Sequence, residues 1–467
     1  MMRLTAAAFA TLVLAGCASF SPDGGMDRVS ELTKERAGLG IAPQRTTQDF
    51  DQARTRVAEL LKQPLSPDTA VELALLNNRG LQASFNQLGI AEADLVQAGR
   101  MRNPVFGFGR LALGGGAAEI DRSIMFDVLG LLTMPAAIRV QRSNFEQAQY
   151  AAASEAVGIA ADTRRAYFGA VAAQEMVKYL RQVKEAADAS NELAKRMLQA
   201  GNFNKLTQMR EQAFYADATS GLARAEQQAV AERERLVRLL GLSGDQLNFV
   251  LPERLPELPK APTTPQNAEQ IAIDKRLDVL MAKRSTEATA RSLGLTNATR
   301  FINGLEVGYQ NKSETGERRQ NGFEIELPIP LFDFGSARSA RAEATYMQSV
   351  HRTAAVAVNA RSEVRESYSA YRTAYDLARH YRDEVVPLRK RISEENLLRY
   401  NGMLIGVFEL LADSREQVRG VTDYVQALRD FWVSETNLQT ALTGRSPGGA
   451  SVPSASPAAA ADQPAGH

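Results

Sequence analysis

The two halves of the sequence repeat each other, and this duplication constrains the fold more than any other feature. Gly201–Gln212 matches Gly406–Gln417 at an offset of 205, with six of twelve positions identical. Earlier in each half, Asp162–Tyr167 matches Glu363–Tyr368 at an offset of 201. Matches that recur in the same order predict a tandem duplication of a unit of about 200 residues.

The repeats are predicted to span residues 65–251 and 265–443. Each begins with a hydroxyl residue followed by proline, Ser66-Pro67 and Thr264-Pro265, which is typical of a helix N-cap and first turn. We expect these first helices over about 67–101 and 265–299. Residues 252–264 lie between the repeats in a proline cluster that cannot be helix interior, and they are predicted to form an extended linker.

A β-hairpin is predicted after each of these helices, over residues 104–132 and 304–330. In the first, Phe106 and Phe108 share one face, and three glycines interrupt the segment at 114–116. In the second, we expect a strand over 304–310 and a polar loop over 311–322. The sequence Phe323–Leu327 then alternates apolar and polar residues, as a strand with one apolar face does.

Very long helices follow each hairpin. No proline occurs between Pro135 and Pro252, between Pro330 and Pro387, or from there to Pro447. A helix from about Ala136 to Ala200 has ~65 residues and a length of roughly 100 Å. Turns at Gly201 and at Gly402 and Gly406 would fold these helices into helical hairpins. In the second repeat, apolar residues from Val350 to Ala378 follow heptad spacing, with Arg361 as a break.

The composition excludes several classes of function. Lys plus Arg is 55 and Asp plus Glu is 54, so the net charge of +1 gives no broad attraction for nucleic acid. One cysteine and three scattered histidines exclude disulfides and argue against a metal site. No catalytic constellation is recognisable, because Gly114-Gly115-Gly116 lacks the Lys and Ser/Thr of a phosphate loop. We therefore expect neither an enzyme nor a cofactor.

The N-terminus predicts a secreted protein. Residues 1–16 have a basic start and a short apolar run, which is typical of a signal peptide. Leu14-Ala15-Gly16-Cys17 resembles a bacterial lipobox, which implies that Cys17 becomes a lipidated first residue. The residue after Cys17 is Ala18 rather than aspartate, which resembles the pattern of lipoproteins that are sorted to the outer membrane. The alternative is an ordinary signal peptide with a coincidental cysteine. A polar lead-in, irregular or partly helical, is expected over 17–64 and a disordered tail over 444–467.

The four predicted strands favour an oligomer. No segment after the signal has 18 consecutive apolar residues, so no transmembrane helix is expected. Two hairpins leave unpaired edges that a bilayer does not tolerate, and four strands are too few for a membrane barrel. Either the strands are soluble or several chains pool them, and three chains would contribute twelve strands. The fold class is mainly α with a small β part, and both the strands and the long amphipathic helical hairpins favour an oligomer with an axial space.

Over residues 65–443 the chain resembles the TolC-like outer-membrane efflux factors. The matching segments, besides the duplication, are Ala70–Ala74 with Asn77-Asn78, Ala91–Asp94, Asn103-Pro104, Pro330–Gly335 and Arg399–Gly402. The resemblance implies a homotrimer whose pooled strands form a twelve-stranded β-barrel in the outer membrane and whose long helical hairpins form an α-barrel, a tunnel through the periplasm. It also implies a periplasmic adaptor and an inner-membrane pump as partners.

The family closes its tunnel at the periplasmic tip with charged side chains. The resemblance places this gate at Arg415, at Asp413, which is displaced by one residue from the family pattern, and at Arg210, the first repeat's counterpart of Arg415. The alternative is a solvated helix face. The tip and its adaptor contact are expected at Gly201, Phe203, Leu206, Gly402, Gly406, Phe408 and Leu411, although Phe203 and Phe408 could simply pack the turns. A coiled-coil outer-membrane lipoprotein without a channel is the alternative function.

Overall fold

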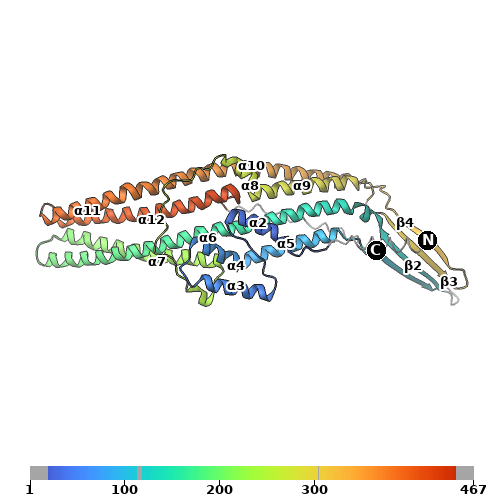
Figure 1. The fold of residues 1–467 in the computed structure, drawn as a ribbon, viewed down its shortest axis with the longest axis horizontal. Coiled ribbons are helices and arrows are strands. Elements are labelled where there is room, and N and C mark those ends of the chain that lie inside the picture. Colours follow the sequence, from blue (N-terminus) through green and yellow to red (C-terminus); the bar gives the residue numbers. More distant parts are fainter. Residues whose placement is uncertain (1–18, 113–117, 303, 449–467) are drawn as a thin grey trace. The chain divides into compact units, whose positions relative to one another are not determined.

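The computed structural model describes residues 19–112, 118–302 and 304–448, and it divides them into two compact units (Figure 1). We name residues 19–32, 82–153 and 278–358 the sheet unit, because they include every described strand. Residues 33–81, 154–277 and 359–448 form the hairpin unit. Cys17 and residues 449–467 of the predicted tail lie outside the described residues.

One antiparallel sheet joins the strands of both repeats. Its order is β1 (Val105–Ala112), β2 (Ala118–Asp127), β3 (Glu306–Glu314) and β4 (Gln320–Glu326). The register between repeats sets Ser123 of β2 opposite Gln310 of β3. The two predicted hairpins are therefore halves of a single sheet, and only β1 and β4 keep a free edge among the described strands.

The strand boundaries differ from the predicted ones in two places. β3 continues to Glu314, so the predicted loop over 311–322 shrinks to residues 315–319. Polar residues on both faces of this part of β3 hide the period-two signal. In the other hairpin β2 ends at Asp127, and the apolar residues 128–132 are helical rather than extended. Periodicity alone cannot distinguish a strand from a helix in such a short apolar run.

Two long helical hairpins follow the strands. The first pairs α6 (Val128–Gln199) with α7 (Lys205–Leu240). In the second, α10 (Ser336–His380), the π-helical turn η3 (Tyr381–Val385) and α11 (Val386–Asn401) precede α12 (Val407–Thr443). The start predicted for the first helix, Ala136, is wrong, because Pro135 lies inside α6. An interior proline removes one backbone hydrogen bond and crowds the carbonyl of the preceding turn, at a cost of about 3 kcal/mol, but it does not end this helix.

The short helices before the strands are each broken in two. In the first repeat, α4 (Pro67–Asn77) and α5 (Arg79–Ala98) meet at Asn78. In the second, α8 (Ala268–Lys275) and α9 (Leu277–Ala298) meet at Arg276. The unbroken helices predicted over 67–101 and 265–299 are therefore wrong. Intrinsic propensity does not reveal these breaks, which tertiary contacts support.

The helix start is as predicted in one repeat only. Ser66 caps α4, accepting a hydrogen bond from Thr69 N, and Pro67 occupies the first turn. In the second repeat the helix begins at Ala268, after Asn267 in the left-handed region, so Thr264 is not its N-cap.

Each helix break lies against the end of the last helix in its repeat. Asn77 Nδ2 donates to the carbonyl oxygens of Leu240, at 3.1 Å, and Gly241, at 2.7 Å. In the second repeat Leu277 N donates to Gly444 O at 2.9 Å. Gly241 is in the left-handed region, and a Cβ there would lie 2.6 Å from Asn77 O. In both repeats the helix break therefore contacts the end of the last helix, through the Asn77 side chain in the first repeat and the Leu277 backbone in the second.

Residues 252–264, which we name the strap, have no helix or strand but are bound to the helices. Leu255 and Leu258 are buried. Trp432 Nε1 of α12 donates to Pro256 O at 3.0 Å, and Tyr375 Oη of α10 donates to Lys260 O at 2.9 Å. Glu175 of α6 accepts from Leu255 N at 3.1 Å. Because its contacts come from both repeats, the strap is a structural element of the hairpin unit and not a free spacer.

Burial raises the pKa of Glu175 above its usual value near 4.5, against the opposing hydrogen bond from Leu255. Between the usual and the raised pKa the folded state holds a proton that the unfolded state releases, so stability falls as pH rises through this window. Glu175→Gln is therefore expected to raise the thermal midpoint at pH 7 and to leave it unchanged near pH 4. Scanning calorimetry across this range checks it, with exposed Glu257→Gln on the strap as control. A stabilisation that is independent of pH would contradict it.

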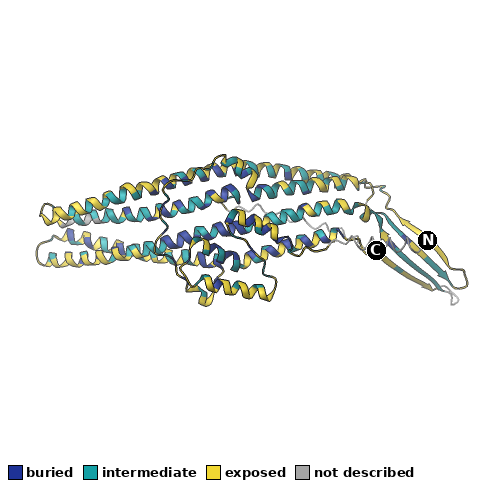
Figure 2. Cartoon of the chain, viewed as in Figure 1, coloured by how far each residue is buried: buried dark blue, intermediate teal, exposed yellow. Residues whose placement is uncertain are grey.

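Aromatic side chains form the core of the hairpin unit. Phe431 is fully buried and lies against the rings of Tyr371, Tyr375 and Trp432, at centroid distances of 5.6, 5.8 and 5.0 Å. Phe168 of α6 stacks on Trp432 at 5.3 Å. The predicted heptad stripe is buried at Val364, Tyr371, Tyr375 and Ala378 but exposed at Ala354, and most of its alanine-rich counterpart on α6 is buried (Figure 2).

The lead-in contains the helices α2 (Met26–Ala37) and α3 (Thr47–Leu60). Ser21 is tied to α5 in the sheet unit, since both its N–H and its Oγ donate to the buried Glu92, at 2.7 and 2.5 Å. None of the helices within the described ranges is long and apolar enough to cross a membrane.

Candidate functional site

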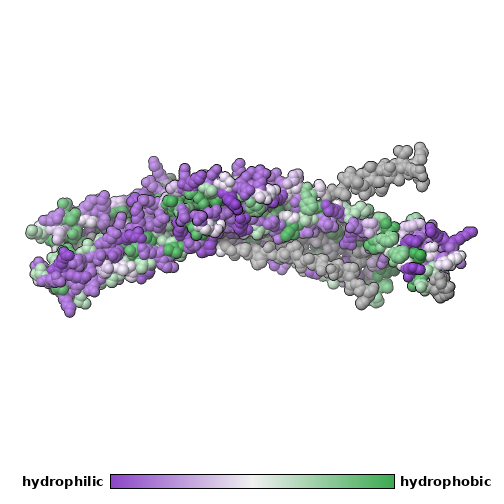
Figure 3. Space-filling model, turned by 90° about the horizontal axis from the view of Figure 1, so that it is seen from below, coloured by the Kyte–Doolittle hydropathy of each residue, from purple (hydrophilic) through white to green (hydrophobic). Residues whose placement is uncertain are grey.

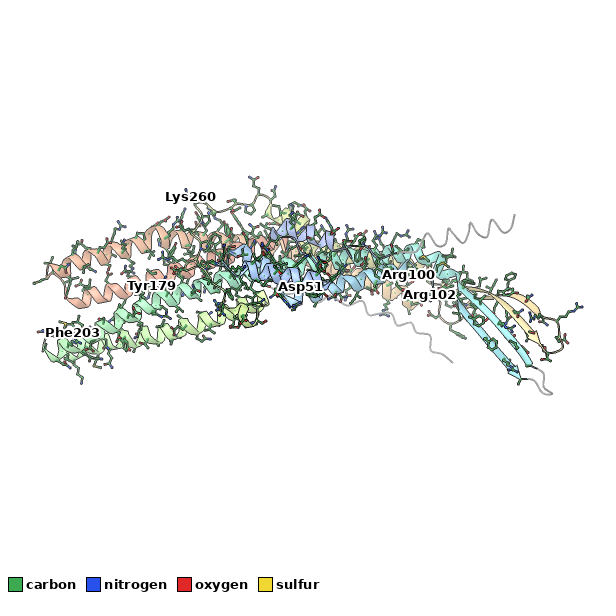
Figure 4. All side chains as sticks on the ribbon, turned by 60° about the horizontal axis from the view of Figure 1, so that its bottom comes forward. Asp51, Arg100, Arg102, Tyr179, Phe203 and Lys260 are labelled. Atoms are coloured by element: carbon green, nitrogen blue, oxygen red, sulfur yellow. The ribbon has the colours of Figure 1, made fainter. Side chains whose placement is uncertain are left out.

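The first turn lies between α6 and α7, at Phe203 in Figure 4. Gly201 takes the left-handed conformation, and Asn202 N donates to Met197 O at 2.8 Å. Asn204 then caps α7 by accepting from Thr207 N. Phe203 is half-buried, whereas Leu206 is 58% exposed. Glycine is favoured here because the φ of +76° costs a residue with a Cβ about 1–2 kcal/mol.

The second turn uses a different backbone. Gly402 is not left-handed, and Met403 takes that conformation instead, at φ +59°. Leu404 N donates to Arg399 O at 2.8 Å, and Gly406 precedes α12 without a side-chain cap. Met403 and Leu404 are 94% and 78% exposed. Phe408 and Leu411 belong to α12, but their side chains lie outside the described part of the chain.

An ion pair links the two repeats behind these turns. Arg415 Nη2 of α12 lies 2.9 Å from Glu211 Oε1 of α7. The Glu211 side chain is only 2% exposed, and its other oxygen accepts from Ser190 Oγ of α6 at 2.9 Å. The Arg415 guanidinium also lies over the ring of Phe214, 4.4 Å from its centroid. A buried carboxylate of α7 is thus held by groups from two other helices, α6 and α12.

Apolar packing supports this pair. Val183 and Ala187 of α6 and Ala218 of α7 form a small buried cluster. Phe214 and Val418 pack against it, and Val418 belongs to α12. The two helical hairpins therefore meet at one site, in which the charged pair is the polar part.

The other predicted gate residues do not join this pair. Asp413 is half-buried, and its Oδ2 is buried without a hydrogen-bond partner among the described residues. Arg210 is exposed and has no ion pair within the described ranges. The pairing partners missed at the sequence level are Glu211 and Ser190. The repeated Arg-Glu at 210–211 and 415–416 was a signal for Glu211, but it did not reveal that the pair crosses between repeats.

The sheet separates its side chains into two faces. Residues directly opposite across strands share a face, and the register places Phe106, Ile124, Tyr309 and Phe323 in one row. The row beside it contains Phe126, Val307 and Ile325, and we name this side the apolar face. The other side, the acidic face, contains seven carboxylates and one lysine: Glu119, Asp121, Asp127, Glu306, Glu314, Glu324, Glu326 and Lys312.

The apolar face extends to both edges of the sheet, whereas the carboxylates of the acidic face lie on β2, β3 and β4 only. β1 and β4 are exposed along nearly their whole length, whereas β2 and β3 are mostly intermediate (Figure 2). Phe323 is 88% exposed and Ile325 is 68% exposed. Apolar side chains are also visible at the base of the sheet in Figure 3. An exposed apolar patch of this kind marks a membrane or protein contact.

No group of three or more His, Cys, Asp or Glu side chains within residues 19–112, 118–302 and 304–448 is arranged to hold a metal ion. The acidic face is spread along three strands, and Lys312 pairs with Glu119 on it. Its arrangement suits a charged surface rather than a coordination site.

Comparison with known proteins agrees with this architecture. Residues 270–392 match the family model of the outer membrane efflux protein. None of the curated proteins matches the sequence.

Solved channels of bacterial outer membranes have the same fold. The outer-membrane channel OprN is 20% identical, with a TM-score of 0.69 over 89% of this chain and 95% of its own. CusC, whose structures concern transmembrane channel formation, is 17% identical, with a TM-score of 0.66 over 81% and 92%. The open MtrE outer membrane channel of Neisseria gonorrhoeae is 15% identical, with a TM-score of 0.67 over 83% and 89%. The chain therefore resembles the TolC-like outer-membrane efflux factors both in its matched domain, residues 270–392, and in its fold.

Proposed function

We propose that this protein is the exit duct of a tripartite efflux or export system, a passive conduit across the outer membrane and periplasm. The observation that supports this most directly is the two-faced sheet with its free edges at β1 and β4. An apolar face suits contact with lipid, and an acidic face suits a water-filled lumen. An exposed apolar face is unfavourable for a chain that acts alone in water.

The free edges support a homotrimer. Backbone groups at a sheet edge have no water to bond inside a bilayer, so β1 of one copy must pair with β4 of the next. Three chains bring twelve strands, which exceeds the minimum of about eight for a membrane barrel. The long helical hairpins would then line the same axis on the periplasmic side.

The two turns and the ion pair behind them support a gate and a docking surface for a partner protein. The Arg415–Glu211 pair holds the two hairpins of one copy together, which suits a closed state. Asp413 and Arg210 remain candidates for contacts between copies. The exposed apolar residues of the turns, Leu206, Met403 and Leu404, suit contact with a periplasmic adaptor, to which an inner-membrane pump supplies the cargo. No step in such a passage needs catalysis, and we propose no enzymatic activity or cofactor.

Cys17 is proposed as the lipid attachment site. Ser21, four residues later, is fastened to Glu92 of the sheet unit, which would hold the anchor beside the membrane part of the chain. Cys17→Ser is expected to abolish acylation, which labelling with radioactive palmitate checks. Undiminished labelling of the variant would show that Cys17 carries no acyl chain.

Two substitutions on neighbouring positions of β4 test the duct. Ile325→Arg puts a charge on the apolar face and is expected to cost about 2–4 kcal/mol of insertion energy at mid-bilayer depth. Glu324→Arg, on the acidic face, is expected to insert normally and to reduce cation selectivity, because it reverses a charge in the lumen. Channel activity and reversal potentials in planar bilayers measure both effects.

The same measurement separates the duct from a coiled-coil lipoprotein without a channel. The wild-type trimer is expected to conduct and to prefer cations over anions. If the purified, lipidated protein forms no pore, or if the two β4 variants behave alike, the measurement favours a coiled-coil lipoprotein without a channel.

A further inference from the structure

The charged residues of the sheet are sorted between its faces. All seven carboxylates and Lys312 lie on the acidic face, whereas Arg110 and Arg122 lie on the apolar face. No acidic residue of the four strands shares the apolar face with these arginines. If this face lies against lipid, as the proposed function requires, two guanidinium groups without a counter-charge are costly there and favour an anion from outside the sheet.

Arg122 belongs to a polar row that crosses the sheet. Its Nη1 donates to Asn311 Oδ1 of β3 at 3.1 Å, and Asn311 Nδ2 donates to Asn321 Oδ1 of β4 at 2.6 Å. Arg122 is half-buried, so these amides hold its guanidinium in place over the sheet.

Arg110 lies on β1, in the next row of the same face, which is further from α6 than the row of Arg122. The register sets Phe108 opposite Arg122 and Arg110 opposite Ile120, so the two arginines are diagonal neighbours. Such neighbours are about 7–8 Å apart and within reach of long side chains. Arg110 is exposed and has no ion pair with a described residue. The two side chains can therefore bind one anionic group together.

The row at Arg122 is also where the apolar band ends. Toward α6, β3 runs from Asn311 back to Glu306 and β4 runs from Asn321 forward to Glu326. The aromatic and aliphatic rows of the apolar face, with Tyr309, Phe323 and Ile325, lie on this side of the Arg122 row. Under the proposed function the arginines therefore lie at the end of the apolar band, where a membrane barrel meets the lipid headgroups.

One arginine at the helix end of the sheet has a carboxylate partner, whereas the two on the apolar face at the strand end have none in the described part of the chain. At the helix end, where Figure 4 labels Arg100 and Arg102, Arg102 pairs with Asp127 at 3.4 Å. At the strand end, Arg110 and Arg122 have no carboxylate on their face. Since the long helices occupy the periplasm under the proposed function, the strand end faces the outer leaflet.

We propose that Arg110 and Arg122, with the Asn311 and Asn321 amides, bind a phosphate of the outer-leaflet glycolipid, lipid A. This inference rests on the proposed function, because it requires the apolar face to lie in the outer membrane. Paired guanidinium groups match the oxygens of a phosphomonoester with several charge-assisted hydrogen bonds. The acyl chains of the same lipid would lie on the rows of Phe106, Ile124 and Phe323.

The test uses the delipidated full-length trimer in detergent. Native mass spectrometry measures its binding of bisphosphorylated lipid A, dephosphorylated lipid A and phosphatidylglycerol. The wild type is expected to bind the bisphosphorylated lipid about 10- to 100-fold more tightly than the dephosphorylated one, as for the loss of one or two charged hydrogen bonds. Equal binding of these two, or equal binding of phosphatidylglycerol, overturns the proposal, and this comparison needs no variant.

Variants locate the site. R110Q combined with R122Q is expected to lose the preference for phosphate, whereas R110K with R122K retains most of it. R100Q combined with R300Q removes the same charge at the helix end and is expected to keep the preference. A Gln pair that folds as a trimer and binds like the wild type overturns the assignment. Conductance of the same preparations separates the two hypotheses: a conducting trimer without phosphate preference contradicts only the lipid site, and a trimer without conductance contradicts the duct.

Discussion

Replacing Arg415 with alanine is expected to raise the open probability of the channel in planar bilayers. The substitution removes the contact that joins α12 to the buried Glu211 of α7. Arg415 is about one-third exposed, so we take about 1 kcal/mol per copy, the upper end of the range for solvent-exposed ion pairs. Three copies opening together would then change the equilibrium by about 100-fold.

Arg419→Ala is the matched control for this prediction. Arg419 lies one turn further along α12 and pairs with Glu416 at 3.1 Å, but it is 72% exposed. Its replacement is expected to leave single-channel recordings unchanged. R415K should restore part of the closure, because it keeps a positive charge near Glu211. Identical recordings for R415A and the wild type would assign Arg415 a packing role only.

Phe431→Ala is expected to cause the largest loss of stability in the hairpin unit. The side chain is fully buried among Tyr371, Tyr375 and Trp432, so its removal leaves a cavity in a rigid aromatic cluster. Losses of about 3–5 kcal/mol are typical of such Phe-to-Ala changes. The thermal midpoint of the purified trimer, followed by circular dichroism, measures the effect.

Leu377→Ala is the control for the core, since Leu377 lies on the same helix as Tyr375 but is 50% exposed. It is expected to change stability by less than about 1 kcal/mol. A similar shift for both variants would mean that the cluster around Phe431 is not the stability centre of this unit.

Much of the architecture could be predicted because it depends on local rules. Proline-free stretches with helical periodicity indicated the long hairpins, and the alternation at Phe323–Leu327 indicated β4. The Ser66-Pro67 start follows from capping chemistry within four residues. The same rule failed at Thr264-Pro265, where the strap is held by Tyr371 and Tyr375 and the helix begins later.

The candidate site was predicted less well, because it depends on contacts distant in sequence. Arg415 was singled out, but its partner Glu211 lies 204 residues away, on the other repeat. Asp413, the nearer carboxylate in sequence, is not its partner. Helical geometry determines the direction of a side chain on its own helix, but it does not reveal which other helix packs on that side.

The sequence by itself determined the duplication, the helical hairpins, the turn at Gly201 and the alternation within β4, because each depends on neighbours along the chain. Only the tertiary structure decided that β2 pairs with β3, that the linker is a bound strap, and that Glu211 is the carboxylate held by Arg415. The reason is that a strand edge or a buried charge must be satisfied by some partner, but several partners satisfy the local pattern equally well. The packing of the two repeats selects one of them.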